Sequence, residues 1–585
     1  MSKYSINFDS IEPIDIQSLG QNTGESYDPF QIENLQYYHP VYDLFKGDSN
    51  EGLENPISLN HPYKFSDSSS IYSVGSPKEK KNRPIFTKFA PLVDPLKFLI
   101  GKYKDDYERI RKLPSANKDD NSHEKLKSIH NASYVDNFFC YLSNQSLYHH
   151  KVLHGIEYYG SFLGIQKKYR MNIADDLDYV MQSNYFLENK GILYEIDDID
   201  ECSHDLFQES SRANKGKLNI HNDTSVSVLS FQEEKEEQGE PIVNDGELIE
   251  VNDFDIENAT DIHLDIPLED DSENSEMNYS DSDDEGDEED EDEEDEEDEE
   301  DEEDEEDEED EEDDDDEEDE EESFVPDPVV NAYFYDFPVQ MICLERCQGT
   351  LDELFAKKIL NLDTTASALF QVIMTLMIYQ KMYNFTHNDL HTQNIMYIET
   401  DIEYLYYSCK TKIYKVPTYG RLYKIIDFGR AIYTFQGNLF CSDSFNIGGD
   451  GHTQYNCEPF YDETKPRIDP NYSFDICRLG CSIYDYILDI DVELDPKVKK
   501  NALEKTIIDW VSDDNGKNVL YKKSGEERYP NFKLYKMIAR TVHNKLPQDQ
   551  LENPYFSQFE YNLSKKAKKD KNIHIVDIDN LPSYI

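Results

Sequence analysis

Two short stretches of this chain carry side chains suited to phosphoryl transfer. In the first, Asp389 and Asn394 stand five residues apart before an apolar pair, and in the second, Asp427 closes an apolar strand-like run as Asp-Phe-Gly. Phosphoryl transfer needs an oriented attacking hydroxyl, clamped phosphates and neutralised charge. We expect Asp389 to accept or orient the acceptor hydroxyl. Asn394 and Asp427 offer the oxygen ligands that Mg²⁺ prefers, which predicts them as its ligands.

Two neighbours of these residues are expected to support them. His387 precedes Asp389 by two positions, and we interpret it as a packing and hydrogen-bonding residue of the loop rather than an acid or base. Gly429 follows Asp427 by two positions and would let the chain leave the strand with an unrestricted φ. Either motif alone is a weak signal, whereas both in this order, each after an apolar run, form a strong one.

The surrounding sequence predicts the elements that position these loops. Residues 364–384 form a long amphipathic helix that leads into the first loop, and 404–423 form a β-hairpin between the two loops. Residues 131–147 also have helical periodicity. Strands at 71–76 and 84–92 are predicted as a hairpin around a basic turn. Thr350, with Glu353 three residues later, predicts a helix start after an apolar strand at 339–345.

Composition limits the other possibilities. Every residue from 287 to 322 is acidic, and the net charge of the chain is −70. Such a run repels itself and buries nothing, so we expect a disordered tether, either a passive spacer or a docking segment for basic partners. Specific binding to nucleic acid is disfavoured. Scattered cysteines favour a reducing compartment, and no signal peptide or membrane span is expected.

The segments His-Asn-Asp-Leu-His and Ile-Asp-Phe-Gly-Arg-Ala, at 387–391 and 426–431, resemble the protein-kinase-like superfamily. More narrowly, they are similar to the serine/threonine kinases encoded by giant DNA viruses. The resemblance implies an α+β, bilobal protein-kinase-like fold with a small β-rich N-lobe, a helical C-lobe and a long disordered acidic insertion. It also implies ATP as donor and Mg²⁺ as metal.

The resemblance also implies a division of the chain. Residues 1–60 would be a poorly ordered N-terminal arm and 61–200 the first part of the N-lobe. Residues 201–325 would be the disordered acidic insertion. Residues 326–550 would hold the last N-lobe strand, the hinge and the C-lobe, and 551–585 would be a C-terminal tail.

Further site residues follow from the same resemblance. Lys88 is the candidate for the strand lysine that holds the α- and β-phosphates, although it could be an ordinary exposed lysine. Asp136 is its candidate acidic partner, with Glu124 as the alternative. Gly75 marks the one plausible phosphate-covering turn, since no Gly-x-Gly-x-x-Gly exists. Main-chain groups of Glu345 and Cys347 would meet adenine at the hinge.

Asp475, at the start of a later helix, is expected to brace the backbone of the catalytic loop, or else to be a plain N-terminal acid favoured by the helix dipole. Three features depart from the family pattern. Asn388 replaces the arginine that pairs with a phosphorylated activation loop, His391 replaces a lysine, and no Ala-Pro-Glu occurs. Control by loop phosphorylation is therefore not expected.

Three functions remain open at this point. The first is a serine/threonine protein kinase acting on a protein substrate, with basic proteins among the candidates. The second is a small-molecule or lipid kinase of the same fold, favoured by His391 and the missing Ala-Pro-Glu. The third is a pseudokinase scaffold that holds basic partners through the acidic run. We expect a cytoplasmic protein, in the host cytoplasm or the virion if it is viral, and not a secreted one.

Overall fold

The computed structural model describes residues 6–10, 27–45, 57–67, 69–115, 120–174, 176–197, 329–488, 490–494, 497–562 and 574–585. These residues belong to one compact unit of mixed strands and helices, in agreement with the expected α+β class. The acidic stretch at 201–325 and the lysine-rich stretch at 565–571 lie outside the described residues.

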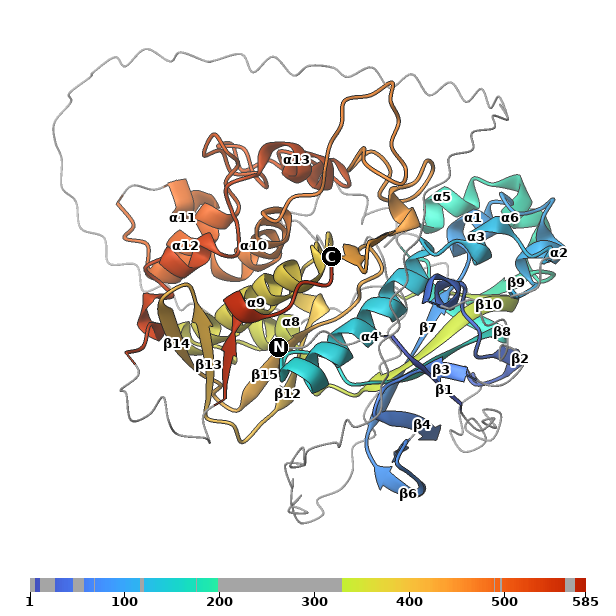
Figure 1. Cartoon of the computed structure of the whole chain (residues 1–585). Coiled ribbons are helices and arrows are strands. Elements are labelled where there is room, and N and C mark those ends of the chain that lie inside the picture. The colour runs from blue at the N-terminus through green and yellow to red at the C-terminus, as the bar shows by residue number, and fades with distance from the viewer. Residues whose placement is uncertain are drawn as a thin grey trace, which may run out of the picture. The chain divides into compact units, whose positions relative to one another are not determined.

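The largest sheet has five strands in which antiparallel neighbours follow the order β2-β8-β10-β7, with β9 also paired to β10. Their bounds are β2 Ile32–Gln36, β7 Ile85–Pro91, β8 Tyr158–Asn172, β9 Tyr194–Ile196 and β10 Asn331–Glu345. Strand β10 places Ile342 opposite Lys88 of β7 and Ser161 of β8. Residues more than 150 positions apart therefore share one ladder (Figure 1).

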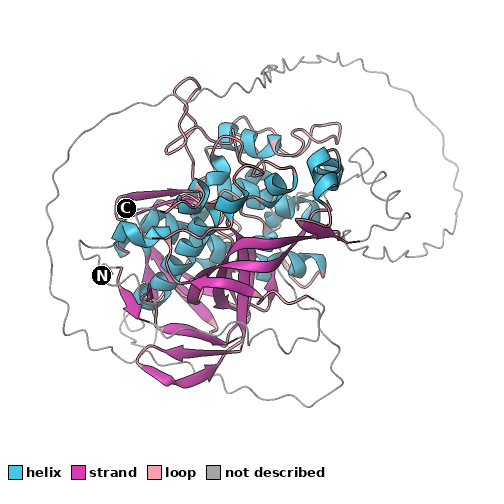
Figure 2. Ribbon diagram, turned by 90° about the vertical axis from the view of Figure 1, so that its right-hand side faces the viewer, coloured by secondary structure: helices cyan, strands magenta, loops and turns pink. Residues whose placement is uncertain are grey.

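The remaining strands form five small sheets. They are β1 Phe8–Ser10 with β3 Ile57–Leu59; β4 Tyr63–Asp67, β5 Ser70–Ser73 and β6 Ser76–Asn82; β11 Gly349–Thr350, β12 Ile395–Glu399 and β15 Arg421–Ile425; β13 Tyr404–Cys409, β14 Lys412–Pro417 and β18 Ile575–Asp577; and β16 Ile432–Phe435 with β17 Asn438–Cys441. In the view of Figure 2 most strands gather below the helices.

Two long helices, α4 Ala132–His150 and α9 Leu362–Tyr383, cover the periodic segments expected at 131–147 and 364–384. The other α-helices are α1 Pro95–Leu99, α2 Tyr107–Ile110, α3 Glu124–Lys127, α5 Leu177–Met181, α6 Asn184–Asn189, α8 Leu351–Ala356, α10 Phe474–Ile487, α11 Ile490–Leu494, α12 Ala502–Trp510 and α13 Lys533–Thr541. Short 3-10 helices are η2 Pro40–Phe45, η4 Thr392–Asn394, η5 Asp443–Phe445, η6 Asp549–Glu552, η7 Ser557–Phe559 and η9 Ile578–Asn580.

Alternation along the central strands decides which side chains face α4. Ile342 of β10 and Ala90 of β7 join the large core that includes α4, whereas Met341 and Phe89 join a second cluster with Phe65 of β4. Side chains in a strand point alternately to opposite faces, so Lys88 lies on the same face as Ala90. The sequence thus directs this lysine toward α4 rather than toward the β4–β5–β6 sheet.

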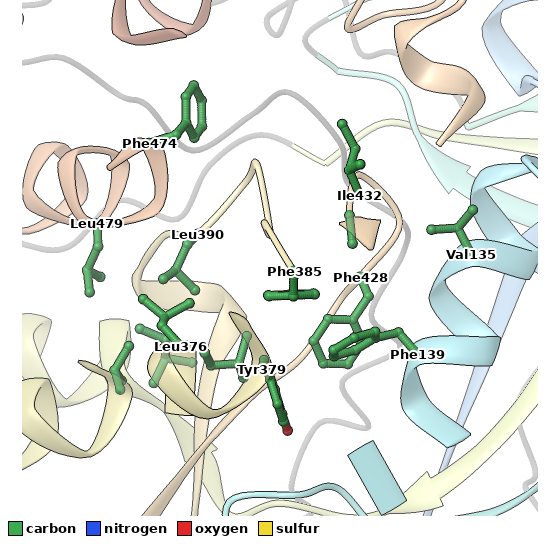
Figure 3. Packing of buried hydrophobic residues seen from close by; sticks show 14 of the residues in the cluster. Val135, Phe139, Leu376, Tyr379, Phe385, Leu390, Phe428, Ile432, Phe474 and Leu479 are labelled. Atoms are coloured by element: carbon green, nitrogen blue, oxygen red, sulfur yellow. The ribbon is translucent and has the colours of Figure 1, made fainter. Parts of the chain in front are cut away.

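An aromatic group joins α4 to both predicted loops. Phe139 of α4 stacks on Phe385 with ring centroids 4.3 Å apart and lies 4.6 Å from the ring of Phe428 (Figure 3). Phe385 precedes the first loop and Phe428 belongs to the second, so burial of these three rings holds the loops against one helix. Burying an aromatic side chain contributes about 1.5–3 kcal/mol, and such pairs add more.

The predicted N-terminal arm is wrong for residues 27–45. Strand β2 pairs with β8, and Phe30 and Ile32 are buried in the second cluster, while Tyr42 is buried in the main core. The predicted tail at 551–585 is also wrong in part, because β18 pairs in parallel with β13 and Tyr584 is buried. Both segments add apolar surface to cores formed by distant residues.

The predicted hairpin of 71–76 and 84–92 is also wrong. Strand β5 pairs with β6 across a turn at Gly75, whereas β7 pairs with β10. The basic residues between 78 and 83 are mostly part of β6, which lies at one edge of its small sheet. Charged residues are common along edge strands, so this run of charge does not mark a turn.

Among the described residues, α9 alone has the length and composition to cross a membrane. In its most apolar window 83% of the residues are buried inside the protein, as in a core helix, so the helix gives no clear membrane span.

Candidate active site

The site is built around Lys88, whose ammonium group lies between two carboxylates. Its Nζ is 2.8 Å from Asp136 Oδ2 and 2.9 Å from Asp427 Oδ1. The side chain is buried, so the alternative of an ordinary exposed lysine is wrong. Burial alone would lower the pKa of Lys88, but the two carboxylates outweigh this effect and raise it. Lys88 is therefore a fixed cation at the edge of the site.

Helix α4 presents Asp136 to this lysine. Asn131 caps the helix and donates an N–H to the carbonyl of Leu92, and Ser133 Oγ donates to the carbonyl of Pro91, so the first turn of α4 is bonded to the end of β7. Lys88 and Asp136, the candidate pair, are therefore in contact. The alternative acid, Glu124, pairs instead with Arg109 and Lys127.

Asp136 also reaches the second loop. Its Oδ1 accepts the N–H of Phe428 at 2.8 Å, next to the Asp427 that pairs with Lys88. One carboxylate on α4 thus holds both the strand lysine and the backbone of the Asp-Phe-Gly stretch. Truncating Asp136 would leave a buried cation and a buried N–H short of a partner at once.

The two loops meet because the strands beside them pair. Strand β12 begins directly after Asn394, and β15 ends two residues before Asp427, with Ile395 opposite Ile425. The N–H of Ile426 donates to the carbonyl of Asn394 at 3.0 Å. Pairing at this end of the ladder therefore fixes Asn394 beside Asp427, which local sequence spacing alone does not require.

The first loop is braced from α10 as expected. Asp475 accepts the backbone N–H of His387 at 2.9 Å and that of Asn388 at 2.8 Å, so it does more than favour its own helix dipole. His387 acts as a hydrogen-bonding residue: Nε2 pairs with the carbonyl of Ile426, and Nδ1 accepts the N–H of Asp389. These bonds require the Nε2–H tautomer.

Asn388 links the loop to the segment after Asp427. Its amide donates to the carbonyl of Arg430 at 2.9 Å and accepts the hydroxyl of Tyr455 at 2.9 Å. The residue also adopts a left-handed φ of 65°, which asparagine tolerates better than most residues. Neutral hydrogen bonds therefore occupy the position where the family pattern has an arginine.

Asp389 lies 6% exposed among cationic groups. Burial alone would raise its pKa, but Arg430, His391, Arg478 and the hydroxyl of Tyr535 together hold the pKa well below the usual range. For Asp427, burial likewise raises the pKa, and Lys88 outweighs it, so the pKa is lowered. Both carboxylates are therefore charged at neutral pH. Each is near enough to affect the other electrostatically.

The role given to Gly429 belongs instead to Asp427. Asp427 adopts a left-handed φ of 61°, whereas the φ of Gly429 lies outside that region. A Cβ on Gly429 would lie 3.4 Å from Asp427 Oδ1, an ordinary contact. The prediction that Gly429 supplies an unrestricted φ is wrong, because the residue that adopts the left-handed φ is Asp427.

The donor set fits a magnesium ion. The carbonyl of Asn394 accepts the N–H of Ile426, the residue before Asp427, and the side chains of Asn394 and Asp427 both carry the hard oxygen atoms that Mg²⁺ takes. The amide nitrogen of Asn394 donates to the carbonyl of Asp389 at 3.0 Å and lies 3.1 Å from His391 Nε2, which turns the amide oxygen away from that carbonyl. The fit rests on the chemistry of these two side chains.

The residues expected at the hinge, Glu345 and Cys347, and the predicted phosphate-covering turn at Gly75 are not part of this cluster. The side chain of Glu345 pairs with Lys424, and its N–H donates to the carbonyl of Glu157, so that donor is engaged within the protein. Cys347 is mostly buried, and burial raises its pKa to about 12. Gly75 lies in the exposed turn between β5 and β6.

A cavity of about 380 Å³ opens beside the cluster. Lys88, Asp136, Asp427, Gly429 and Arg430 are among the residues that line it. Gly75, Glu345, Cys347, Asp389 and Asn394 do not line it. Sequence reasoning missed Arg430, Lys424, Arg478 and Tyr535. A charged residue inside an apolar run, as in Lys424-Ile-Ile, is the one local signal that could have revealed any of them.

A buried lysine shared by two aspartates, together with Asp389 and Asn394 of the first loop, brings together the residue types that phosphoryl transfer uses. Known proteins agree in part. A stretch of 88 residues is 33% identical to the serine/threonine-protein kinase haspin of Bos taurus and covers 15% of this chain. A stretch of 145 residues, 24% of this chain, is 31% identical to a "Putative serine/threonine-protein kinase" of Acanthamoeba polyphaga mimivirus.

The chain matches 11% of the length of haspin and 32% of the viral protein. No family model matches the chain. These partial similarities point to the protein-kinase-like class and carry no detail of substrate.

Proposed function

We propose that this chain is an ATP- and Mg²⁺-dependent protein kinase with a bilobal kinase-like fold that transfers the γ-phosphate to serine or threonine hydroxyls. The observation that carries the proposal is the cluster in which Lys88 joins Asp136 of α4 to Asp427. The partial similarity to two serine/threonine kinases supports the same function. The free thiols of the described cysteines suit the reducing cytoplasm that we propose as its location.

Each residue of the cluster has a role in this reaction. Lys88 would hold the α- and β-phosphates, and Asp389 would orient the acceptor hydroxyl toward the γ-phosphate. Asp427 and Asn394 would hold Mg²⁺, which neutralises the charge that develops on the phosphates. Asp475 and Asp136 keep the two loops in register through backbone N–H groups.

The test is incubation of the whole chain with labelled ATP, Mg²⁺ and basic proteins. We expect label on serine or threonine, and a fall of about 10²–10⁴-fold in Asp389→Asn, the usual contribution of a residue that takes a proton in the transition state. Asp549→Asn, an exposed aspartate outside the cluster, is the matched control and should retain the wild-type rate.

The acceptor of the label decides between the alternatives. Label on a lipid or metabolite, with none on protein, would replace the proposal by a small-molecule kinase, which His391 favours. No label on any acceptor, together with no Mg²⁺-dependent thermal shift by ATP, would leave the pseudokinase scaffold as the remaining function. Equal label from wild type and Asp389→Asn would overturn the role of Asp389.

A further inference from the structure

Helix α13 brings a tyrosine to the carboxylate of Asp389 from 146 residues further along the chain. Tyr535 Oη lies 2.8 Å from Asp389 Oδ1, and both residues are buried. A hydrogen bond to an ionised carboxylate is shorter and about twice as strong as one between neutral groups. No local sequence pattern predicts this contact, and the residue roles proposed above do not include it.

The direction of the hydrogen bond follows from a third residue. Arg478 Nε lies 3.0 Å from the same Tyr535 oxygen. Arginine only donates, so the phenol oxygen accepts from Arg478, and its single proton is left for Asp389. The order is therefore Arg478 to Tyr535 to Asp389. Burial raises the pKa of Tyr535, which keeps the phenol protonated and able to donate.

Two other aromatic rings pack against the tyrosine ring. Phe532 stacks on it with ring centroids 5.5 Å apart, and Phe474 of α10 lies 6.1 Å away. Arg478 belongs to the same helix α10 whose Asp475 holds the backbone of His387 and Asn388. Helix α10 thus fixes the position of the loop backbone directly, and it fixes the position of the Asp389 carboxylate through Tyr535.

A removable cover over Asp389 is the competing interpretation. Helix α13 also buries Leu534, Ile538 and Ala539 in the main core, so its departure would expose apolar surface as well as the Tyr535 contact. Apolar burial of this kind opposes opening, whereas a covering segment must leave at low cost. The packing therefore favours a fixed support.

We propose that Tyr535 is a positioning residue that, backed by Arg478, orients the Asp389 carboxylate toward the acceptor hydroxyl. The inference rests on the proposed phosphotransferase function, since orientation of Asp389 matters only if this carboxylate meets an acceptor. A carboxylate free to rotate would spend less time in the reactive geometry, and small misplacements of reacting groups cost up to about 10²-fold in rate.

The experiment compares single-turnover rates, so that product release does not hide the chemical step. In Tyr535→Phe we expect a rate about 10- to 100-fold below wild type with an unchanged Kd for Mg²⁺-ATP. Replacing Tyr535 by 3-fluorotyrosine keeps the donor and should keep the rate within a few-fold of wild type. Tyr555→Phe removes another hydroxyl, one that donates to the carbonyl of Leu362, and should leave the rate unchanged.

A second measurement does not depend on activity. In urea unfolding, the midpoint shifts of Asp389→Ala and Tyr535→Phe should fail to add in the double variant, because each removes one partner of the same hydrogen bond. Additive shifts would overturn the inference whatever the activity. Normal transfer by Tyr535→Phe would overturn it and leave the proposed function standing.

The remaining outcomes are also decisive. A transfer rate higher in Tyr535→Phe than in wild type would mean that α13 covers Asp389. Phosphate found on Tyr535 of the wild type would mean that this residue is an acceptor. Either result would replace the positioning role. Absence of transfer by the wild type, with the contact confirmed by unfolding, would remove the proposed function and the positioning role with it.

Discussion

At the scale of single residues, the site depends on buried charges that satisfy one another. Lys88 pairs with two aspartates, and neither Asp136 nor Asp427 has another cation within ion-pair distance among the described residues. Taking charges out of water costs several kcal/mol for each ion, which the pairing only offsets. Such a cluster adds little net stability, but the loss of one member leaves the other charges buried without the partner that offsets their desolvation cost.

The first prediction concerns Lys88→Met. We expect a loss of about 3–5 kcal/mol in the free energy of unfolding, because the buried carboxylates of Asp136 and Asp427 lose their common cation. Phosphoryl transfer should fall below detection. Urea unfolding at pH 7 measures the stability change, and the labelled-ATP assay measures transfer.

Lys357→Met is the matched control, since this lysine pairs with Glu353 on an exposed helix face with 64% of its side chain accessible. Exposed pairs of this type contribute about 0.3–0.5 kcal/mol. A Lys88→Met variant as stable as this control would mean that the three buried charges do not interact as their distances indicate.

At the scale of elements, local periodicity and spacing predicted α4, α9 and the two loops, since each depends on residues close in sequence. Contacts between distant segments could not be predicted in this way. Strand β2 has the sequence Ile-Glu-Asn-Leu-Gln, too polar to suggest a strand, and its partner β8 begins more than 100 residues later. The contact of Tyr535 with Asp389 likewise leaves no trace in either local pattern.

The segment from β2 to η2 is attached to the central sheet by a buried histidine. His39 Nε2 lies 3.0 Å from Ser161 Oγ of β8, and Nδ1 lies 3.2 Å from Gln340 Nε2 of β10. The amide nitrogen can only donate, so Nδ1 accepts and the imidazole is neutral. Burial lowers the pKa of His39 to about 4.

The second prediction follows from the sign of this shift. As the pH falls from 6.5 toward 4, the unfolded chain binds a proton at this histidine and the folded chain does not, so stability is lost. His39→Gln removes this titration. We expect the variant to lose about 3 kcal/mol less than wild type between pH 7 and pH 4, from about 2.5 pKa units at 1.36 kcal/mol each.

Urea unfolding at a series of pH values provides the measurement, with His543→Gln as control because His543 is exposed. A His39→Gln variant whose stability falls as steeply as that of wild type would show that His39 already takes up its proton in the folded state. In that case the N-terminal segment would not be attached through a neutral imidazole.

At the scale of the whole molecule, the described unit is built from chain on both sides of the acidic stretch. Strand β9 ends at Ile196, which lies opposite Ala332 of β10, and the N–H of Asp197 donates to the carbonyl of Asn331 at 2.9 Å. The N–H of Asn331 returns a bond to Asp197 Oδ2 at 3.0 Å. The described residues on either side of 198–328 therefore meet in an antiparallel ladder.

The third prediction is that this ladder tolerates a short loop. We expect a variant in which four Gly/Ser residues replace 198–328 to fold, and to be more stable than wild type by at most about 2–3 kcal/mol, since closing a flexible loop costs more as it lengthens. Its thermal shift with Mg²⁺-ATP should match wild type, because Lys88, Asp389 and Asp427 all lie outside the replaced stretch.

A second variant that lacks only 287–322 separates structure from recruitment. If this acidic run docks basic partners, both deletions should raise the KM for basic proteins while the KM for ATP stays unchanged, and the effect should weaken in high salt, which screens such charges. Equal KM values in all three proteins would make the run a passive spacer. A deletion variant that fails to fold would instead show that residues 198–328 contribute to the fold, contrary to the closure of β9 on β10.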